Sequence, residues 1–94
     1  MAKIEAVIYK KLLNRGTTGL VEPDQNIIYA DIRLRGKELL DILIHEGTHI
    51  LQPYLKEEAV NDIGIELSNM LWDQGWRRVD FYEPPPEQDE NTEG

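Results

Sequence analysis

Residues 37–52 constrain the fold of this chain most, because their apolar residues recur with the 3.6-residue period of an amphipathic α-helix. Pro53 cannot continue such a helix, so the sequence predicts that it ends at Gln52. A second helical pattern runs over residues 56–74. The three-residue break between the two patterns predicts a hairpin of two antiparallel helices.

The part of the chain before these helices has the pattern of a β-hairpin. Residues 20–22 and 27–33 are predicted strands, and Pro23 occupies a favoured position in the turn between them. Residues 3–11 fit either a strand or a helix, and their pattern does not decide. Residues 76–82 are predicted to form a last short strand. Together these patterns predict an α+β fold.

Length and composition restrict the function classes. Ninety-four residues allow one domain, which we place at residues 1–82. Cysteine is absent, which excludes disulfides, Cys-ligated zinc and thiol nucleophiles. A net charge of −8 argues against partners with phosphate backbones and against anionic membrane surfaces. No stretch resembles a signal peptide or the roughly 20 apolar residues of a membrane span, so we expect a soluble, cytoplasmic protein.

Residues 83–94 have a composition unlike the rest of the chain. They contain five acidic residues, no basic residue and three consecutive prolines. Such a segment cannot bury enough apolar surface to offset the entropy lost on ordering. We predict a disordered tail, which is either a solubilising end or a segment that reaches back into a functional site.

The most specific motif is His45-Glu46-Gly47-Thr48-His49, in the middle of the first helical pattern. Two histidines four residues apart lie on one face of a helix, which suits two ligands of a tetrahedral zinc ion. Glu46 lies beside that face, where it can take a proton from water that the ion activates. Core histidines are the alternative interpretation of this pattern.

A helical wheel favours metal ligands over core histidines. Advancing about 100° per residue places four polar residues within about 40° of His45 on one face: Glu38, Asp41, His49 and Gln52. The opposite arc holds the residues expected to pack on a core: Leu40, Leu43, Ile44, Gly47, Ile50 and Leu51. The histidines are therefore predicted to face away from the packed side.

Hydrolytic zinc needs a third protein ligand, and the chain has no third histidine. The helical hairpin brings the start of the second helix towards His49. On the wheel of that helix, Glu57 lies about 60° from the centre of the apolar face, whereas Glu58 lies about 160° away. Glu57 is our predicted third ligand and Glu58 its main competitor. Alternatively, both simply favour a helix N-terminus electrostatically.

The segments that carry these candidate ligands resemble those of a known family. His45-Glu46-x-x-His49 with a following glutamate is similar to the gluzincin zinc metallopeptidases, including their minimal versions. Glu57-x-x-Val60-Asn61-x-Ile63-Gly64 is similar to the Glu-x-x-Ala-Asn-x-Phe-Ala segment of repressor-cleaving peptidases from phages and mobile elements. The resemblance covers residues 27–76, favours Glu57 over Glu58, and implies a minimal zincin-like domain. That domain has a small antiparallel sheet or hairpin packed on the active-site helix, and the second helix carries the third ligand.

The resemblance further implies that the strand before the active-site helix, residues 27–33, is an edge strand that aligns an extended peptide substrate. An ordinary hairpin is the alternative. Candidates for oxyanion stabilisation are Tyr54, Arg77, Arg78 and Tyr82. The expected function is zinc-dependent hydrolysis of peptide bonds with Glu46 as the base. The alternatives are a non-catalytic module stapled by zinc and a latent peptidase plugged by its own tail.

Overall fold

The computed structural model describes residues 2–12, 18–22 and 24–79. Three strands precede two helices, which makes the protein a small α+β domain, as predicted. The elements in chain order are β1 (Ala6–Lys10), β2 (Gly19–Glu22), β3 (Ile27–Asp31), α1 (Gly36–Leu51) and α2 (Glu57–Asp73). The predicted hairpin and both predicted helices are present, and residues 3–11 contain a strand rather than a helix. The predicted tail, residues 83–94, lies outside the described residues.

The three strands form one mixed sheet in the order β1-β3-β2. β2 pairs antiparallel with β3 through their tight turn, whereas β1 pairs parallel with β3 along its whole length. The predicted antiparallel hairpin is therefore present as β2 and β3, but the prediction of an antiparallel sheet is wrong for β1. A hairpin can be read from a local turn, but the parallel pair joins strands separated by all of β2, and no local pattern specifies that pairing.

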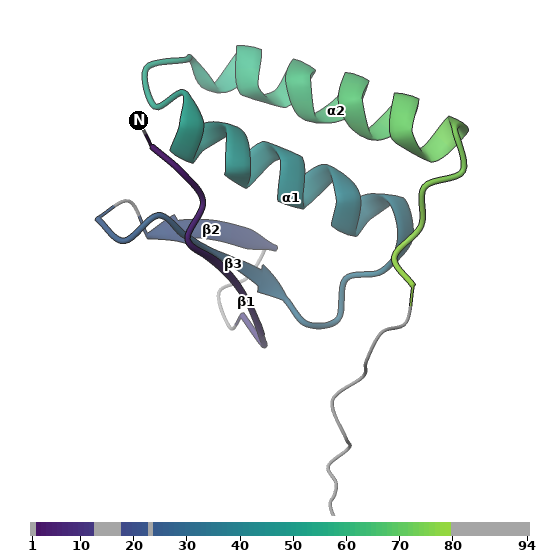
Figure 1. The fold of residues 1–94 in the computed structure, drawn as a ribbon, viewed down its shortest axis with the longest axis horizontal. Coiled ribbons are helices and arrows are strands. Elements are labelled where there is room, and N and C mark those ends of the chain that lie inside the picture. The colour runs from purple at the N-terminus through teal and green to yellow at the C-terminus, as the bar shows by residue number, and fades with distance from the viewer. Residues whose placement is uncertain (1, 13–17, 23, 80–94) are drawn as a thin grey trace, which may run out of the picture.

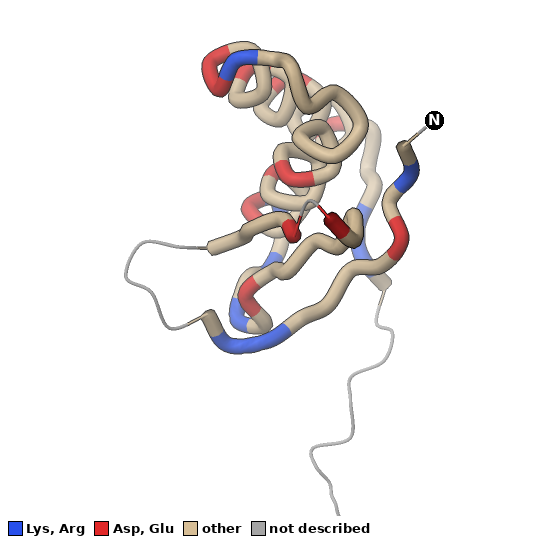
Figure 2. Tube along the Cα trace, turned by 90° about the vertical axis from the view of Figure 1, so that its left-hand side faces the viewer, with Lys and Arg blue, Asp and Glu red and all other residues tan. Residues whose placement is uncertain are grey.

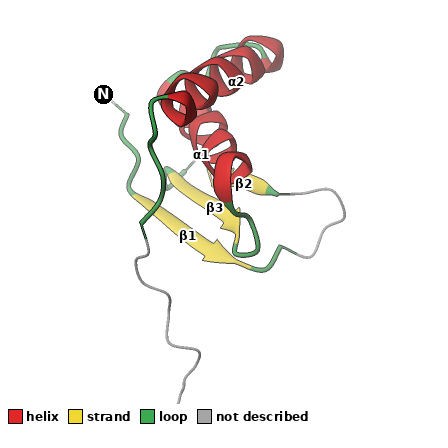
Figure 3. Cartoon of the chain, turned by 90° about the vertical axis from the view of Figure 1, so that its right-hand side faces the viewer, coloured by secondary structure: helices red, strands yellow, loops and turns green. Residues whose placement is uncertain are grey.

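The elements are stacked in three layers. Figures 1 and 3 show α1 lying across one face of the sheet and α2 lying over α1 on the side away from the sheet. Among the described elements, α1 contacts β2 and β3, and α2 contacts α1 but no strand. The helix α1 is therefore the middle layer, between the sheet and α2.

The main core lies between α1 and the central strand. Ala30 of β3, Leu34 of the following turn and Leu39 of α1 form a buried cluster, which Tyr9, Ile42 and Leu43 extend. Ile28 and Val60 are also fully buried. Leu51, which is expected on the packed face of the first helix, is instead 46% exposed.

Residues 76–79 contain no strand, which contradicts the prediction for that part of the segment. They continue from the end of α2 and are held there by Arg77, whose Nη1 donates hydrogen bonds to the carbonyl oxygens of Trp72 and Trp76. Residues 80–82 of the predicted strand lie outside the described residues.

Charge is distributed unevenly over the fold. Figure 2 shows acidic residues along both helices, and Lys and Arg mainly where β1 ends and α1 begins. The basic residues of that region are Lys10, Lys11, Arg33, Arg35 and Lys37. Within the described residues, no helix is long and apolar enough to cross a membrane.

Candidate metal site

The first two residues of the candidate site lie one turn apart on α1. His45 and His49 have ring centroids 4.9 Å apart, with their planes inclined at 74°. They are only partly buried, with 16% and 29% of their side chains exposed. Leu39, Gly47 and Ile50 bury the sheet-facing side of the same helix. The histidines therefore point away from the main core, as the wheel predicts.

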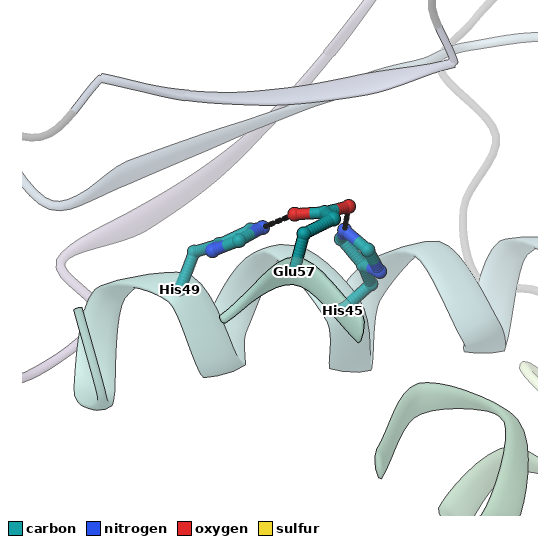
Figure 4. A group of neighbouring side chains, drawn as sticks. All are labelled: His45, His49 and Glu57. Carbon is teal, nitrogen blue, oxygen red and sulfur yellow. Dashed lines mark ion pairs between the residues drawn. The ribbon is translucent and has the colours of Figure 1, made fainter. Parts of the chain in front are cut away.

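Glu57, the first residue of α2, brings its carboxylate to both imidazoles. His45 Nε2 lies 3.1 Å from Oε2 of Glu57, and His49 Nε2 lies 2.9 Å from Oε1 of the same carboxylate. Figure 4 shows the three side chains converging above one face of α1. One ligand atom from each of the three lies within 4.8 Å of the others, so together they could hold a metal ion.

The turn between the helices and a close helix crossing bring Glu57 to this place. The Leu55 amide donates a hydrogen bond to the Gln52 carbonyl oxygen, which closes the turn after α1. Further along α2, Gly64 lies directly against α1. A β-carbon added there would stand 2.7 Å from Asp41 Oδ1 and 3.6 Å from His45 Cβ. The missing side chain thus lets α2 run closely along the face of α1 that carries His45.

Glu58, the competing third ligand, is not part of this cluster. It lies beside Tyr54, Leu55, Lys56 and Ala59 around a shallow pocket on the outside of the helical turn. The structure therefore brings together His45, His49 and Glu57 and leaves Glu58 apart. That these three residues bind zinc stays a prediction.

Glu46 lies between α1 and the sheet rather than among the predicted ligands. Its side chain is next to Gly19, the first residue of β2: a β-carbon on Gly19 would stand 3.2 Å from Glu46 Cγ and 3.4 Å from Oε2. The pKa of Glu46 is raised, mainly because the carboxyl group is partly buried. Positive charge on His45 and His49 would lower this pKa, and the negative charge of Glu57 raises it further. A carboxyl group with a raised pKa suits proton transfer near neutral pH.

The sequence pattern does not reveal the role of Gly19, which comes directly before the predicted strand at residues 20–22. A glycine at the start of a strand is one signal of close backbone approach, and it could have drawn attention to this position. The partner of that approach, Glu46, becomes visible only when β2 and α1 are placed side by side.

The strand next to the candidate site is β2, not the strand predicted from the resemblance. β3 pairs with β1 on one side and with β2 on the other, so residues 27–31 form the central strand and cannot be an edge. Among the described strands, β2 and β1 are the edges of the sheet. Because Gly19 of β2 contacts Glu46, β2 is the edge strand beside the site.

The candidates for oxyanion stabilisation separate clearly in space. Tyr54 is 97% exposed in the turn between α1 and α2, next to the histidine end of α1. Arg77 and Arg78 line a cavity with Gly36 and Leu40, at the opposite end of that helix, so they cannot reach the site. Tyr82 lies outside the described residues.

The donor set fits a divalent zinc ion. Two imidazole nitrogens and a carboxylate oxygen are a usual set of three protein ligands, with metal bonds of about 2.0 to 2.2 Å. Tetrahedral geometry at such bond lengths separates neighbouring ligand atoms by roughly 3.3 Å. The two nitrogen–oxygen separations in the cluster, each to a different oxygen of Glu57, are 3.1 and 2.9 Å, a little shorter than that value.

Comparison of the chain with protein families, with curated proteins and with solved structures finds no match in any of the three.

Proposed function

We propose that this protein is a zinc-dependent metallopeptidase with a minimal zincin-like fold. The observation that carries the proposal is the convergence of His45 Nε2, His49 Nε2 and the Glu57 carboxylate, with Glu46 one residue along α1. The resemblance of the His-Glu-x-x-His segment to gluzincins supports the same interpretation.

In this proposal His45, His49 and Glu57 hold the zinc ion. When bound, the ion would supply a Lewis acid that lowers the pKa of a water molecule towards about 7 and polarises the scissile carbonyl. Glu46 would accept the proton of the attacking water as the water oxygen bonds to the carbonyl carbon. It then passes the proton to the leaving amine as the C–N bond breaks. Burial beside Gly19 supports this role, because it keeps the carboxylate less hydrated than one on the surface.

The proposed substrate is a peptide in extended conformation. β2 is an edge strand with its outer backbone groups unpaired among the described strands, and its first residue contacts Glu46. An extended peptide that pairs with such an edge completes its hydrogen bonds and is held at a fixed distance from α1. In this proposal the residues that align the substrate are Gly19–Glu22 and not those of β3.

The proposal is tested with the zinc-loaded, full-length chain on a mixture of unstructured peptides, with cleavage followed by mass spectrometry. Glu46→Gln should lower cleavage at least about 100-fold and leave the zinc content unchanged, because it removes the base but no ligand. Glu58→Gln is the matched control and should retain activity, since Glu58 lies outside the cluster. Cleavage by the Glu46→Gln variant equal to that by the original chain would contradict the proposed peptidase.

A zinc-stapled, non-catalytic module is the second candidate, and the position of Glu57 favours it. The cluster joins the end of α1 to the first residue of α2 in a chain without cysteine, where a metal would stabilise a small core. In that case zinc should raise the melting temperature equally in the original chain and in the Glu46→Gln variant, and neither should cleave any peptide.

A further inference from the structure

A second concave site lies on the other side of α1. It is a cavity of about 420 Å³, within the size range of small-molecule sites. Its walls come from β1, the first half of α1, the end of α2 and the segment after α2. The lining residues are Tyr9, Gly36, Leu39, Leu40, Leu43, Leu71, Trp72, Trp76, Arg77 and Arg78. In Figure 1 the segment that follows α2 runs past the first turn of α1, and Trp76, Arg77 and Arg78 of this segment belong to the cavity lining.

The cavity is separate from the candidate metal site. At about 100° per residue, Leu40 and Leu43 point roughly 140° to 160° away from His45 around α1. Along the axis, Gly36 and His49 are separated by about 20 Å. The cavity and the metal cluster therefore flank opposite sides and opposite ends of one helix, and a ligand in one does not contact the other.

The charged residues in the described lining of the cavity differ from those of the chain as a whole. Its lining includes two arginines and no acidic residue, although the whole chain has a net charge of −8. The guanidinium of Arg77 lies 3.4 Å from the ring centroid of Trp72, and that of Arg78 lies 4.5 Å from the ring centroid of Tyr9. Both rings belong to the cavity lining, so stacking holds both cations at it.

Arg77 has donors left for a ligand. Its hydrogen bonds to described residues, to the carbonyl oxygens of Trp72 and Trp76, both use Nη1. A guanidinium carries five N–H donors in a planar fork, so Nη2 and Nε are available in the described part of the chain. These donors match the two oxygens of a carboxylate.

We propose that this cavity binds an amphipathic monocarboxylate, with its hydrocarbon body between Leu39, Leu43 and Trp72 and its carboxylate at Arg77. The apolar walls account for the hydrocarbon body, because burying it removes apolar surface of both partners from water. The remaining donors of Arg77 account for the anionic end, since they match the two oxygens of a carboxylate. This site does not depend on the proposed peptidase function.

Tryptophan fluorescence tests the proposal directly, because Trp72 and Trp76 are the only two tryptophans of the chain and both line the cavity. The full-length protein is titrated with decanoate below its aggregation concentration, and with decanol and decyltrimethylammonium as probes of equal chain length. We expect a saturable change with decanoate and an affinity at least about tenfold above that for either other probe, as charge-assisted hydrogen bonds imply.

Arg77→Gln should abolish the preference for decanoate over decanol. Arg35→Gln is the matched control, because Nη1 of Arg35 also holds two backbone carbonyl oxygens, those of Ile32 and Leu34, but Arg35 is not in the cavity lining. It should bind decanoate like the original chain. If Arg77→Gln does not fold, Leu40→Trp, which fills the cavity, should block decanoate binding.

Three results would overturn the proposal. One is no fluorescence change with decanoate in the full-length chain, the result expected if residues 80–94 or a second copy fill the cavity. Another is equal affinity for decanoate and decanol, which would indicate only an apolar surface. The third is an undiminished preference for decanoate in the Arg77→Gln variant.

Discussion

Gly19 of β2 lies against Glu46 and Ile42 of α1 so closely that a methyl group does not fit between them. A β-carbon on Gly19 would stand 2.6 Å from Ile42 Cγ2 and 3.2 Å from Glu46 Cγ. The edge strand and the proposed catalytic base are therefore held at a distance that only glycine permits.

Gly19→Ala should push β2 and Glu46 apart and lower peptide cleavage about 10- to 100-fold, because small displacements of a catalytic group are costly. Zinc affinity should change little, since neither residue is a proposed ligand. Ile8→Ala is the control: Ile8 lies on β1, the other edge strand, where it pairs with Tyr29 and is 38% exposed, and the variant should keep its activity. A Gly19→Ala variant with full activity would contradict the positioning role.

Gly64→Ala should destabilise the fold by about 1 to 3 kcal/mol, as overpacking of a close contact does. Its β-carbon would meet Asp41 Oδ1 at 2.7 Å, with the Asp41 carbonyl oxygen at 3.6 Å. Thermal unfolding of the metal-free chain measures the effect.

Gly47→Ala is the comparison for Gly64→Ala. Alanine favours the helix by about 1 kcal/mol at both positions, but at Gly47 the new methyl group would meet only the ends of the Ile4 and Ile28 side chains, at 3.1 and 3.8 Å. We therefore expect a smaller loss of stability than at Gly64. A larger loss at Gly47 would show that the sheet-facing contact, not the helix crossing, is the tighter one.

Asp31 should make the fold sensitive to acid. It is buried and accepts hydrogen bonds from the Arg33 side chain, the Arg33 amide and the Leu12 amide, and the Arg33 contacts are the main cause that lowers its pKa. Because its pKa is lower in the folded state than in the unfolded state, its contribution to stability is complete above the unfolded value and is lost as the pH falls below about 4.

Denaturant unfolding at several pH values tests this. Asp31→Asn should lower the free energy of unfolding at pH 7 and flatten its decrease below pH 4. Asp62→Asn is the control, because Asp62 is exposed on α2. An unchanged acid profile in the Asp31→Asn variant would show that other groups control acid unfolding.

Deleting residues 87–94 should leave zinc affinity and peptide cleavage unchanged. The residues among its acids are polar or glycine and offer little apolar surface to hold a plug in a cleft. Cleavage by the full-length and truncated chains, with Glu46→Gln as the inactive control, measures the effect. Several-fold faster cleavage by the truncated chain would instead support the latent peptidase.

The sequence predicts those parts of the fold that local patterns determine. The 3.6-residue period and Pro53 specify α1 and its end, and the turn near Pro23 specifies the pairing of β2 with β3. The parallel pairing of β1 with β3 has no local signal, so the central position of β3 could not be predicted. The edge strand was assigned to the wrong segment for the same reason.

In the candidate site, too, local patterns predict some features, and the packing of distant segments determines the others. His45, Glu46 and His49 lie within one helical pattern, and Glu57 follows from the wheel of α2 and the short turn before it, so the sequence is sufficient to bring them together. The contact of Glu46 with Gly19 depends on how α1 lies across the sheet. The cavity beside Trp72 combines residues from β1, α1, α2 and the segment after it, and no single pattern in the chain contains them.

Anomalous diffraction at the zinc absorption edge, on crystals of the chain loaded with one equivalent of zinc, tests the central claim most directly. The account predicts one strong peak, within about 2.0 to 2.2 Å of His45 Nε2, His49 Nε2 and a Glu57 oxygen. A peak whose third protein ligand is Glu58, or no peak at the two histidines, would contradict it.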